Sequence, residues 1–164
     1  MAIAIIGDTH MPKGNRELPV RCVEILRGSD LIVHTGDFSG LETLELIESI
    51  GPPVVAVHGN VDAPAVVARL PQRASFEPAP GLEVAVVHDG GPRPGRLARL
   101  RRHFPSADVV VFGHSHLPLH ERDEDGFQIF NPGSPTERRR APEHTMGVAE
   151  VDSEGRLRFH HVSL

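Results

Sequence analysis

The chain has 164 residues, 39% hydrophobic and 24% charged, which is ordinary for one globular domain over residues 1–164. The formal net charge of −5 and the absence of Trp and Tyr argue against broad nucleic-acid binding and against binding to an anionic membrane. The single cysteine, Cys22, excludes an internal disulfide, and no apolar stretch is long enough for a signal-peptide core or a membrane span. We therefore expect a cytoplasmic protein with no membrane partner.

Short apolar segments rich in Val and Ile predict strands in the first two thirds of the chain. Their near-continuous apolar character is typical of strands covered on both faces, as in parallel sheets. We expect these strands at residues 2–6, 31–34, 53–58, 82–88 and 108–114.

Amphipathic segments between the strands predict helices at 17–28, 39–51 and 95–104. Ser39 is the expected N-cap of the second helix. Segments rich in Pro and Gly near 71–80 and 91–95 predict loops. The alternation of strands and helices indicates an α/β fold.

The last third of the chain has a different pattern. Residues 118–123 and 127–133 flank the turn sequence EDG, and residues 145–152 and 156–164 flank SEG. Both arrangements predict antiparallel hairpins.

Each of the five expected apolar strands is followed by polar side chains. The carboxyl ends of parallel strands share one edge of a sheet, which is where α/β proteins build their sites. We therefore expect seven side chains to meet in one region: Asp8, His10, Asp37, Asn60, His88, His114 and His116.

This combination of carboxylate, amide and imidazole groups predicts a metal centre. Such ligands suit divalent Mn, Fe, Co, Ni or Zn. Seven ligands are too many for one catalytic zinc, which takes three protein ligands and keeps an open position. They suit two metals if one carboxylate bridges them, and Asp37, on a strand expected to be central, is the natural bridge. Two neighbouring metals can clamp a phosphoryl group.

The motifs GDTH, GDF, GNVD, VVH and GHSH follow one another in the order found in calcineurin-like metallophosphoesterases, and the chain resembles that superfamily. The sequence NPGS at 131–134 also resembles its short prokaryotic branch, which includes small phosphodiesterases. The resemblance runs from about residue 3 to the last strand. It implies an α/β fold in which a sandwich of two mixed β-sheets is flanked by helices.

The resemblance also implies roles for the seven residues. Asp8, His10, Asp37 and His116 would hold one divalent ion, and Asp37, Asn60, His88 and His114 would hold the other. A bridging hydroxide would attack phosphorus in line with the leaving oxygen, with Asp37, Asn60 and His88 as catalytic residues. Mn is the first expectation for both ions, with Ni, Fe, Co and Zn as alternatives.

The chain departs from the pattern of many larger family members at one position. Those proteins have a histidine after GN that is thought to protonate the leaving group, whereas this chain has Val61. The substitution favours a diester over a monoester substrate. His58 is either a replacement proton donor or a strand-end histidine packed beside the site. Asp62 is expected to orient a ligand imidazole.

Two further positions are candidates for supporting groups. His34 precedes Asp37 by three residues and is either a supporting residue of the site or a hydrogen-bonded core histidine. Arg138, in the run 138–140, could bind a substrate phosphate. The arginines between residues 93 and 102 are expected to form a solvated helix face.

These observations favour a metal-dependent phosphodiesterase acting on a small phosphate ester. A phosphomonoesterase or nucleotidase is the alternative within enzymes. The alternative from another class is a protein-interaction scaffold, because a subunit of the retromer coat resembles the same branch and serves mainly in assembly. The complete set of seven ligands favours the enzyme. The sequence leaves a homo-oligomer open.

Overall fold

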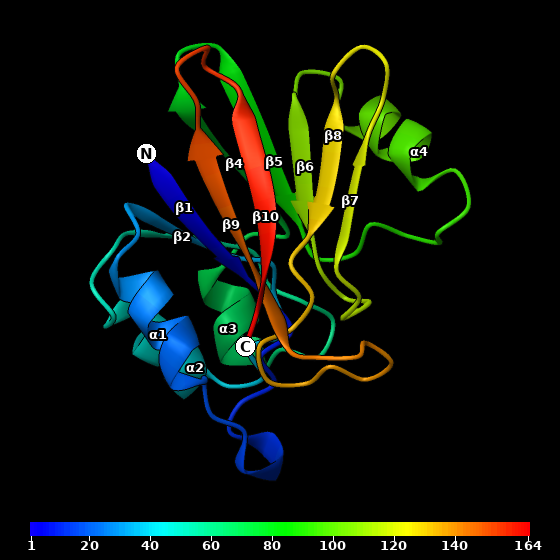
Figure 1. Ribbon diagram of the computed structural model, residues 1–164. Coiled ribbons are helices and arrows are strands. Elements are labelled where there is room, and N and C mark those ends of the chain that lie inside the picture. The colour runs from blue at the N-terminus through cyan, green and yellow to red at the C-terminus, as the bar shows by residue number, and fades with distance from the viewer.

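A computed structural model describes residues 1–164 as two five-stranded sheets packed face to face (Figure 1). The first sheet has the order β10-β9-β1-β2-β3. Its strands are β1 (Ala2–Ile6), β2 (Leu31–His34), β3 (Val54–Ala56), β9 (Thr145–Val151) and β10 (Leu157–Ser163). The second sheet has the order β4-β5-β6-β8-β7. Its strands are β4 (Arg73–Ala79), β5 (Leu82–Val87), β6 (Val109–Phe112), β7 (Leu119–Arg122) and β8 (Gln128–Asn131).

Both sheets are mixed, as the resemblance to the metallophosphoesterases implies. Strands β1, β2 and β3 run parallel, and so do β5, β6 and β8. The two expected hairpins, β7–β8 and β9–β10, are antiparallel, and β9 pairs antiparallel with β1. The five strands that are predicted to end in polar clusters therefore lie in the parallel parts of the two sheets, together with β8.

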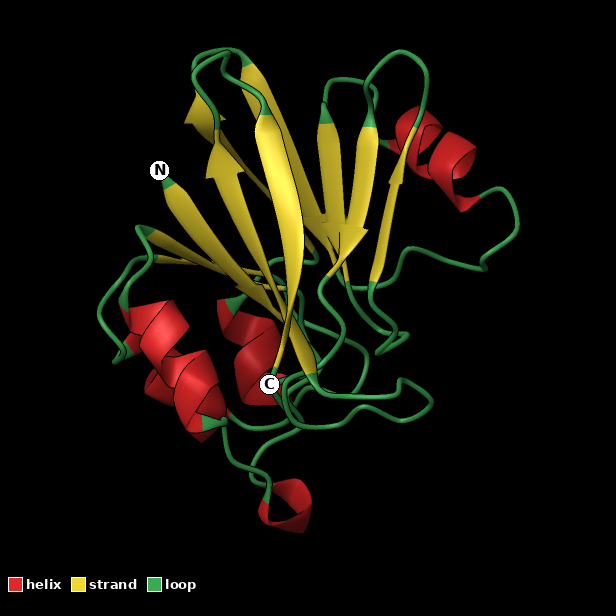
Figure 2. Ribbon diagram, viewed as in Figure 1, coloured by secondary structure: helices red, strands yellow, loops and turns green.

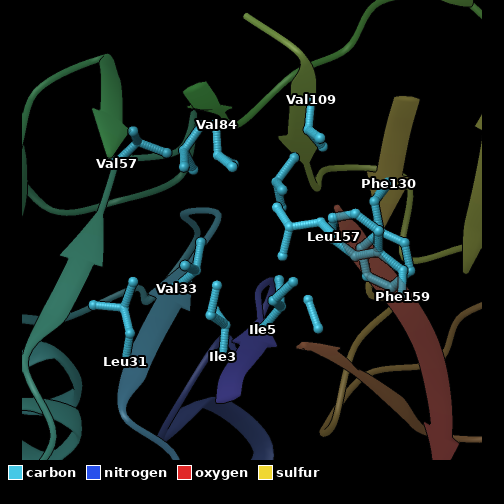
Figure 3. Packing of buried hydrophobic residues seen from close by; sticks show 13 residues of the cluster. Ile3, Ile5, Leu31, Val33, Val57, Val84, Val109, Phe130, Leu157 and Phe159 are labelled. Atoms are coloured by element: carbon cyan, nitrogen blue, oxygen red, sulfur yellow. The ribbon is translucent and has the colours of Figure 1, made fainter. Parts of the chain in front are cut away.

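The apolar run in β1 is explained by burial on both faces. Ile3 and Ile5 point between the sheets, where they pack with residues such as Val109 and Phe130 (Figure 3). Ala4 and Ile6 point to the opposite face and pack under helices. Because alternate side chains of a strand point to opposite faces, a strand covered on both sides needs an apolar residue at every position.

Helices cover the outer faces of the sandwich (Figure 2). The first sheet is covered by α1 (Val20–Arg27), α2 (Leu41–Glu48) and α3 (Pro64–Arg69), and the second by α4 (Arg96–His103). A short 3-10 helix, η1 (Lys13–Asn15), lies in the loop after β1. No helix has the length and apolar character that crossing a membrane would require.

Two local predictions were wrong. Residues 71–80 were expected to form a loop, but Arg73–Ala79 form the edge strand β4, in which exposed and partly buried residues alternate. An edge strand tolerates Pro78 because its outer N–H groups need no partner. Ser39 does not cap α2: the N-cap is Gly40, and the Ser39 N–H instead donates to Asp62. The short helix α3 was not predicted, since six residues give too little periodicity.

Candidate metal centre

The loops that follow β1, β2, β3, β5 and β6 meet at one end of the sandwich, at the lower end of Figure 1. Hydrogen bonds from backbone N–H groups join them. The Asp8 N–H donates to the Gly36 carbonyl at 2.9 Å, and the His114 N–H donates to Asp8 Oδ1 at 3.1 Å. The parallel strands thus deliver the predicted ligands to one region, as expected from their common direction.

The first group of ligands is formed by Asp8, His10 and His116, all of them buried. The Nε2 atoms of His10 and His116 lie 3.2 Å apart. His116 Nε2 lies 3.6 Å from Asp8 Oδ1. We call these residues the first triad.

The second group is formed by Asp37, His88 and His114, and we call it the second triad. His88 Nε2 lies 3.3 Å from Asp37 Oδ2 and 3.2 Å from His114 Nδ1. The side-chain oxygen of Asn60 joins this group, at 2.9 Å from His88 Nε2 and 3.0 Å from His114 Nδ1.

Asp37 links the two triads. Its Oδ2 atom lies 3.3 Å from His88 Nε2 and 3.7 Å from His10 Nε2. Its other oxygen, Oδ1, accepts the Val61 N–H at 3.0 Å, which fixes the carboxylate in place. This is the position that a bridging ligand would need.

Hydrogen bonds on the far side of two imidazoles direct their Nε2 atoms inward. His88 Nδ1 donates to the Thr35 carbonyl at 2.8 Å, and His116 Nδ1 donates to the Glu137 carbonyl. A proton held at Nδ1 leaves the Nε2 lone pair of the neutral ring free for a metal.

The chemistry of these residues fits divalent cations. Asp8 Oδ2 is buried and has no hydrogen-bond partner in the protein. A buried carboxylate oxygen without a partner is costly, and facing imidazole lone pairs offer it no proton. A divalent ion in each triad would satisfy both the carboxylates and the imidazoles.

The electrostatics of the first triad follow from burial. Burial raises the pKa of Asp8 to about 7, lowers the pKa of His116 to about 4, and lowers the pKa of His10 as well. The two imidazoles are therefore neutral at pH 7, which is their ligand form.

In the second triad the Asp37–His88 pair outweighs burial. Burial alone would raise the pKa of Asp37, but its hydrogen bond with His88 and the charge of that ring lower it to about 2. The same contact raises the pKa of His88 against the effect of its burial. A metal ion must displace the proton that this pair favours on His88.

Many of the expected ligands have an unusual backbone conformation. Five of them have a positive φ angle although they are not glycines: Asp8, His10, Asp37, His114 and His116. Left-handed backbone in residues other than glycine is uncommon and concentrates at functional sites.

The residues 131–136 brace the ligand loops from the side. Ser134 Oγ donates to the Asp8 carbonyl at 2.8 Å, and Thr136 Oγ1 donates to the Thr9 carbonyl at 2.6 Å. Asn131 Nδ2 donates to the Gly113 carbonyl at 2.8 Å. The NPGS sequence therefore connects the loop that carries Asp8 with the loop that carries the last two histidines.

Asp62 was predicted to orient a ligand imidazole, and this prediction was wrong. Its carboxylate contacts no imidazole. It accepts the backbone N–H groups of Asp37 at 3.0 Å, Ser39 at 2.8 Å and Gly59 at 2.7 Å. Asp62 therefore holds together the backbone of the loops that carry Asp37 and Asn60.

His34 is both buried and in contact with the ligand loops. Its Nδ1 atom accepts the Gly36 N–H at 3.1 Å, its Nε2 atom donates to Thr9 Oγ1 at 3.2 Å, and its ring stacks on Phe38. Burial lowers its pKa to about 3. It therefore acts as a neutral connector between the loops after β1 and β2.

The other two supporting candidates lie outside both triads. His58 is half-buried, and its Nδ1 atom donates to the Gly59 carbonyl at 3.2 Å. Arg138 donates to the carbonyls of Ala141 at 3.0 Å and Pro142 at 3.2 Å, so it braces its own loop.

Sequence reasoning missed Glu137 and Arg16. Glu137 Oε2 lies 3.5 Å from His10 Nε2, and Arg16 Nη2 lies 2.7 Å from Glu137 Oε1. The pair connects the loop after β1 with residues 131–144, far away in the chain, and neither residue lies in a strand-end motif that would have marked it.

The arginines near α4 are only partly a solvated face. Arg99 donates to the carbonyls of Gly90, Pro92 and Pro94, and Arg96 donates to that of Gly91. They hold the loop that follows His88.

Comparisons with known proteins agree with this geometry. Residues 1–154 match the model of the calcineurin-like phosphoesterase superfamily domain. A probable metallophosphoesterase of Methanothermobacter thermautotrophicus is 33% identical over 156 residues, which cover 94% of this chain and 88% of that relative. The chain belongs to the calcineurin-like phosphoesterase superfamily.

Solved structures show the same fold. Vps29 from Entamoeba histolytica in complex with Zn²⁺ has a TM-score of 0.77 at 20% identity, with 99% of each chain covered. A novel archaeal phosphodiesterase has a TM-score of 0.72 at 22% identity, covering 99% of this chain and 100% of that one. The chain thus has the metallophosphoesterase fold over its whole length. Its family membership supports a phosphoester hydrolase.

Proposed function

We propose that this calcineurin-like phosphoesterase is a phosphodiesterase with two divalent metal ions. The observation that carries the proposal is the position of Asp37 Oδ2, within 3.3 Å of His88 Nε2 and 3.7 Å of His10 Nε2. One carboxylate oxygen is thus close to ligand atoms of both triads. The archaeal phosphodiesterase of the same fold supports the choice of reaction.

The two ions would be held by this chain's own groups. Asp8, His10 and His116 would bind the first, Asn60, His88 and His114 would bind the second, and Asp37 would bind both. When bound, the ions would supply a polarised nucleophile and neutralise charge on the phosphoryl group. Mn is our first choice because the set mixes carboxylate and imidazole, and Ni, Fe, Co or Zn would also suit it.

The residues around the ligands would hold them in position and keep water away from them. Thr35 and Glu137 hold His88 and His116 through backbone carbonyls. Asp62 fixes the backbone of Asp37 and Gly59. The burial of the first triad keeps water away from its ligands and strengthens their attraction to a cation.

The preference for a diester rests on Val61. This residue follows Asn60, is 51% exposed, and carries no proton that could reach a leaving group. General acid catalysis contributes roughly 10²–10⁴-fold to a rate. A substrate with an activated leaving group would therefore be hydrolysed better than one with a poor leaving group.

The test is hydrolysis of bis(p-nitrophenyl) phosphate and of p-nitrophenyl phosphate by protein stripped of metal and reloaded with Mn, Ni or Zn. The proposal expects metal-dependent cleavage with the diester preferred. A preference for the monoester would favour the phosphomonoesterase alternative. No turnover with any metal, despite two bound equivalents of metal, would favour the scaffold alternative. The structural similarity to Vps29 is the reason to test that alternative.

A further inference from the structure

One carboxylate at the metal centre belongs to neither triad and follows no strand directly. Glu137 lies in the loop between β8 and β9, and its side chain is 28% exposed. Its Oε2 atom lies 3.5 Å from His10 Nε2 and 4.0 Å from His116 Nδ1. The Glu137 carboxylate therefore contacts both imidazoles of the first triad.

The distance from Glu137 to His10 is the distance expected between two ligands of one ion. Two atoms that each lie about 2.1 Å from one metal ion are about 3.0 Å apart when they meet at a right angle and about 3.4 Å apart in a tetrahedron. Within the first triad, His10 Nε2 lies 3.2 Å from His116 Nε2, and Asp8 Oδ1 lies 3.6 Å from His116 Nε2. The 3.5 Å contact of Glu137 Oε2 lies between these two values.

The contacts also place the two carboxylates at opposite ends of the imidazole pair. Asp8 Oδ1 contacts His116 Nε2, which contacts His10 Nε2. Glu137 Oε2 in turn contacts His10 Nε2. An ion with six ligands binds groups on opposite sides of itself, so this arrangement can accommodate both carboxylates.

The other polar atoms of Glu137 already have partners. Arg16 Nη2 donates to Oε1 at 2.7 Å. The Glu137 N–H donates to Ser134 Oγ at 2.9 Å, and the Glu137 carbonyl accepts the Nδ1 proton of His116. The Oε2 atom accepts no hydrogen bond, and it is the oxygen that faces His10.

His10 Nε2 faces three acceptors. They are His116 Nε2 at 3.2 Å, Glu137 Oε2 at 3.5 Å and Asp37 Oδ2 at 3.7 Å. The nitrogen of His116 is an acceptor because its proton is held at Nδ1. One proton on His10 Nε2 could satisfy only one of the three, whereas a divalent ion could bind all four atoms.

We propose that Glu137 Oε2 is a fifth protein ligand of the first ion and makes this site prefer Mn²⁺ to Zn²⁺. The inference rests on the proposed function, which gives that ion four protein ligands: Asp8, His10, Asp37 and His116. Four ligands complete the tetrahedral set of zinc. Five ligands, three of them carboxylates, suit the higher coordination number and the oxygen preference of Mn²⁺. Arg16 holds Oε1, so Glu137 binds the ion through Oε2 alone.

The first experiment measures the affinities of metal-free wild type, Glu137→Gln and Glu143→Gln for Mn²⁺ and for Zn²⁺, in competition with a chelator. Glu143 is the matched control, because it is an exposed acid of the same loop. In Glu137→Gln, one of the two sites should bind Mn²⁺ at least about 100-fold more weakly and Zn²⁺ no more than about 10-fold more weakly. Glu143→Gln should keep the wild-type affinities.

The ratio of the two losses separates a ligand from a residue that only supports the loop. A supporting residue would change the affinities for both ions alike. Equal losses for Mn²⁺ and Zn²⁺ in Glu137→Gln, or no loss at all, would overturn the proposal. The variant keeps the size of the side chain and an acceptor for Arg16, so its melting temperature in EDTA should equal that of the wild type.

A second variant tests the ion pair by itself. Arg16→Met removes the partner of Oε1 and leaves the Glu137 carboxylate in place. Its Mn²⁺ affinity at both sites should stay within about 10-fold of the wild type. A loss of Mn²⁺ affinity as large as that of Glu137→Gln would show that the ion pair supports the site, and the assignment of Glu137 as a ligand would be wrong.

Failure of the proposed function gives a different result. If the wild type binds two ions but cleaves no phosphate ester, the phosphodiesterase assignment fails. The affinities for Mn²⁺ and Zn²⁺ still decide whether Glu137 is a ligand, because they measure metal binding and not turnover.

Discussion

Asp37 Oδ2 lies 3.3 Å from His88 Nε2, and this contact joins the ends of β2 and β5, which belong to different sheets. The metal centre is therefore built across the sandwich and not on one sheet. Its geometry depends on the packing of the two sheets against each other, which the apolar cluster in Figure 3 provides.

The bridging position of Asp37 predicts that its loss affects both metals. Asp37→Asn should reduce bound metal from two equivalents to one or none, and hydrolysis of the activated diester should fall by at least about 100-fold. Metal content can be measured by mass spectrometry after gel filtration. Asp125→Asn, at an exposed turn, is the control and should keep both equivalents. Two tightly held equivalents in Asp37→Asn would show that the carboxylate does not bridge.

The contacts of Asp62 predict a loss of stability, because three backbone N–H groups would lose their acceptor. Asp62→Ala should lower the free energy of unfolding by about 3 kcal/mol in metal-free protein. Chemical denaturation in EDTA measures this directly. If Asp62 acted only by orienting a ligand, the metal-free stability would stay unchanged and only metal affinity would fall.

Val61 predicts a change in substrate preference. Val61→His places a proton donor next to Asn60 at an exposed position, and the backbone N–H that holds Asp37 is kept. The ratio of kcat/KM for an alkyl phosphate to that for the p-nitrophenyl ester should rise by at least about 10-fold. An unchanged ratio in a variant with two bound metals would show that a missing general acid does not set the preference.

The buried His34 predicts a pH dependence of stability. Its pKa is lowered to about 3 in the folded protein, so below the unfolded value of 6.5 the unfolded chain binds a proton that the folded chain does not. The stabilisation is complete above pH 6.5 and is lost progressively as the pH falls toward 3. Between pH 7 and pH 5 this one group should cost about 2 kcal/mol of stability.

The comparison that isolates this effect is His34→Gln against His103→Gln, both in EDTA. His103 is exposed at the end of α4. In the wild type, the free energy of unfolding at pH 7 exceeds that at pH 5. This difference should be about 2 kcal/mol smaller in His34→Gln. The His103 variant should keep the wild-type difference. A wild-type difference in His34→Gln would assign the acid sensitivity to other groups.

The strands and the ligands were predictable because each ligand group directly follows a short apolar run in the sequence. The run Ala2–Ile6 is apolar at every position because both of its faces are buried, and the polar residues after it are at the shared edge of the sheet. The edge strand β4 was missed because its alternating burial and its Pro78 resemble a loop.

The supporting contacts could not be predicted because they depend on tertiary structure. Asp62 was expected to contact a side chain, yet it bonds to backbone N–H groups, which leave no trace in the sequence. The Glu137 carboxylate contacts the His10 ring, although the two residues are 127 positions apart in the sequence. Among three consecutive arginines, only the structure shows that Arg138 is used within its loop and Arg139 is free.

An anomalous difference map from a crystal of the Mn-loaded protein tests the bridged metal centre most directly. We expect two peaks, one among Asp8, His10 and His116 and the other among Asn60, His88 and His114, with Asp37 contacting both. A single peak, or two peaks of which only one contacts Asp37, would contradict a centre that this carboxylate bridges.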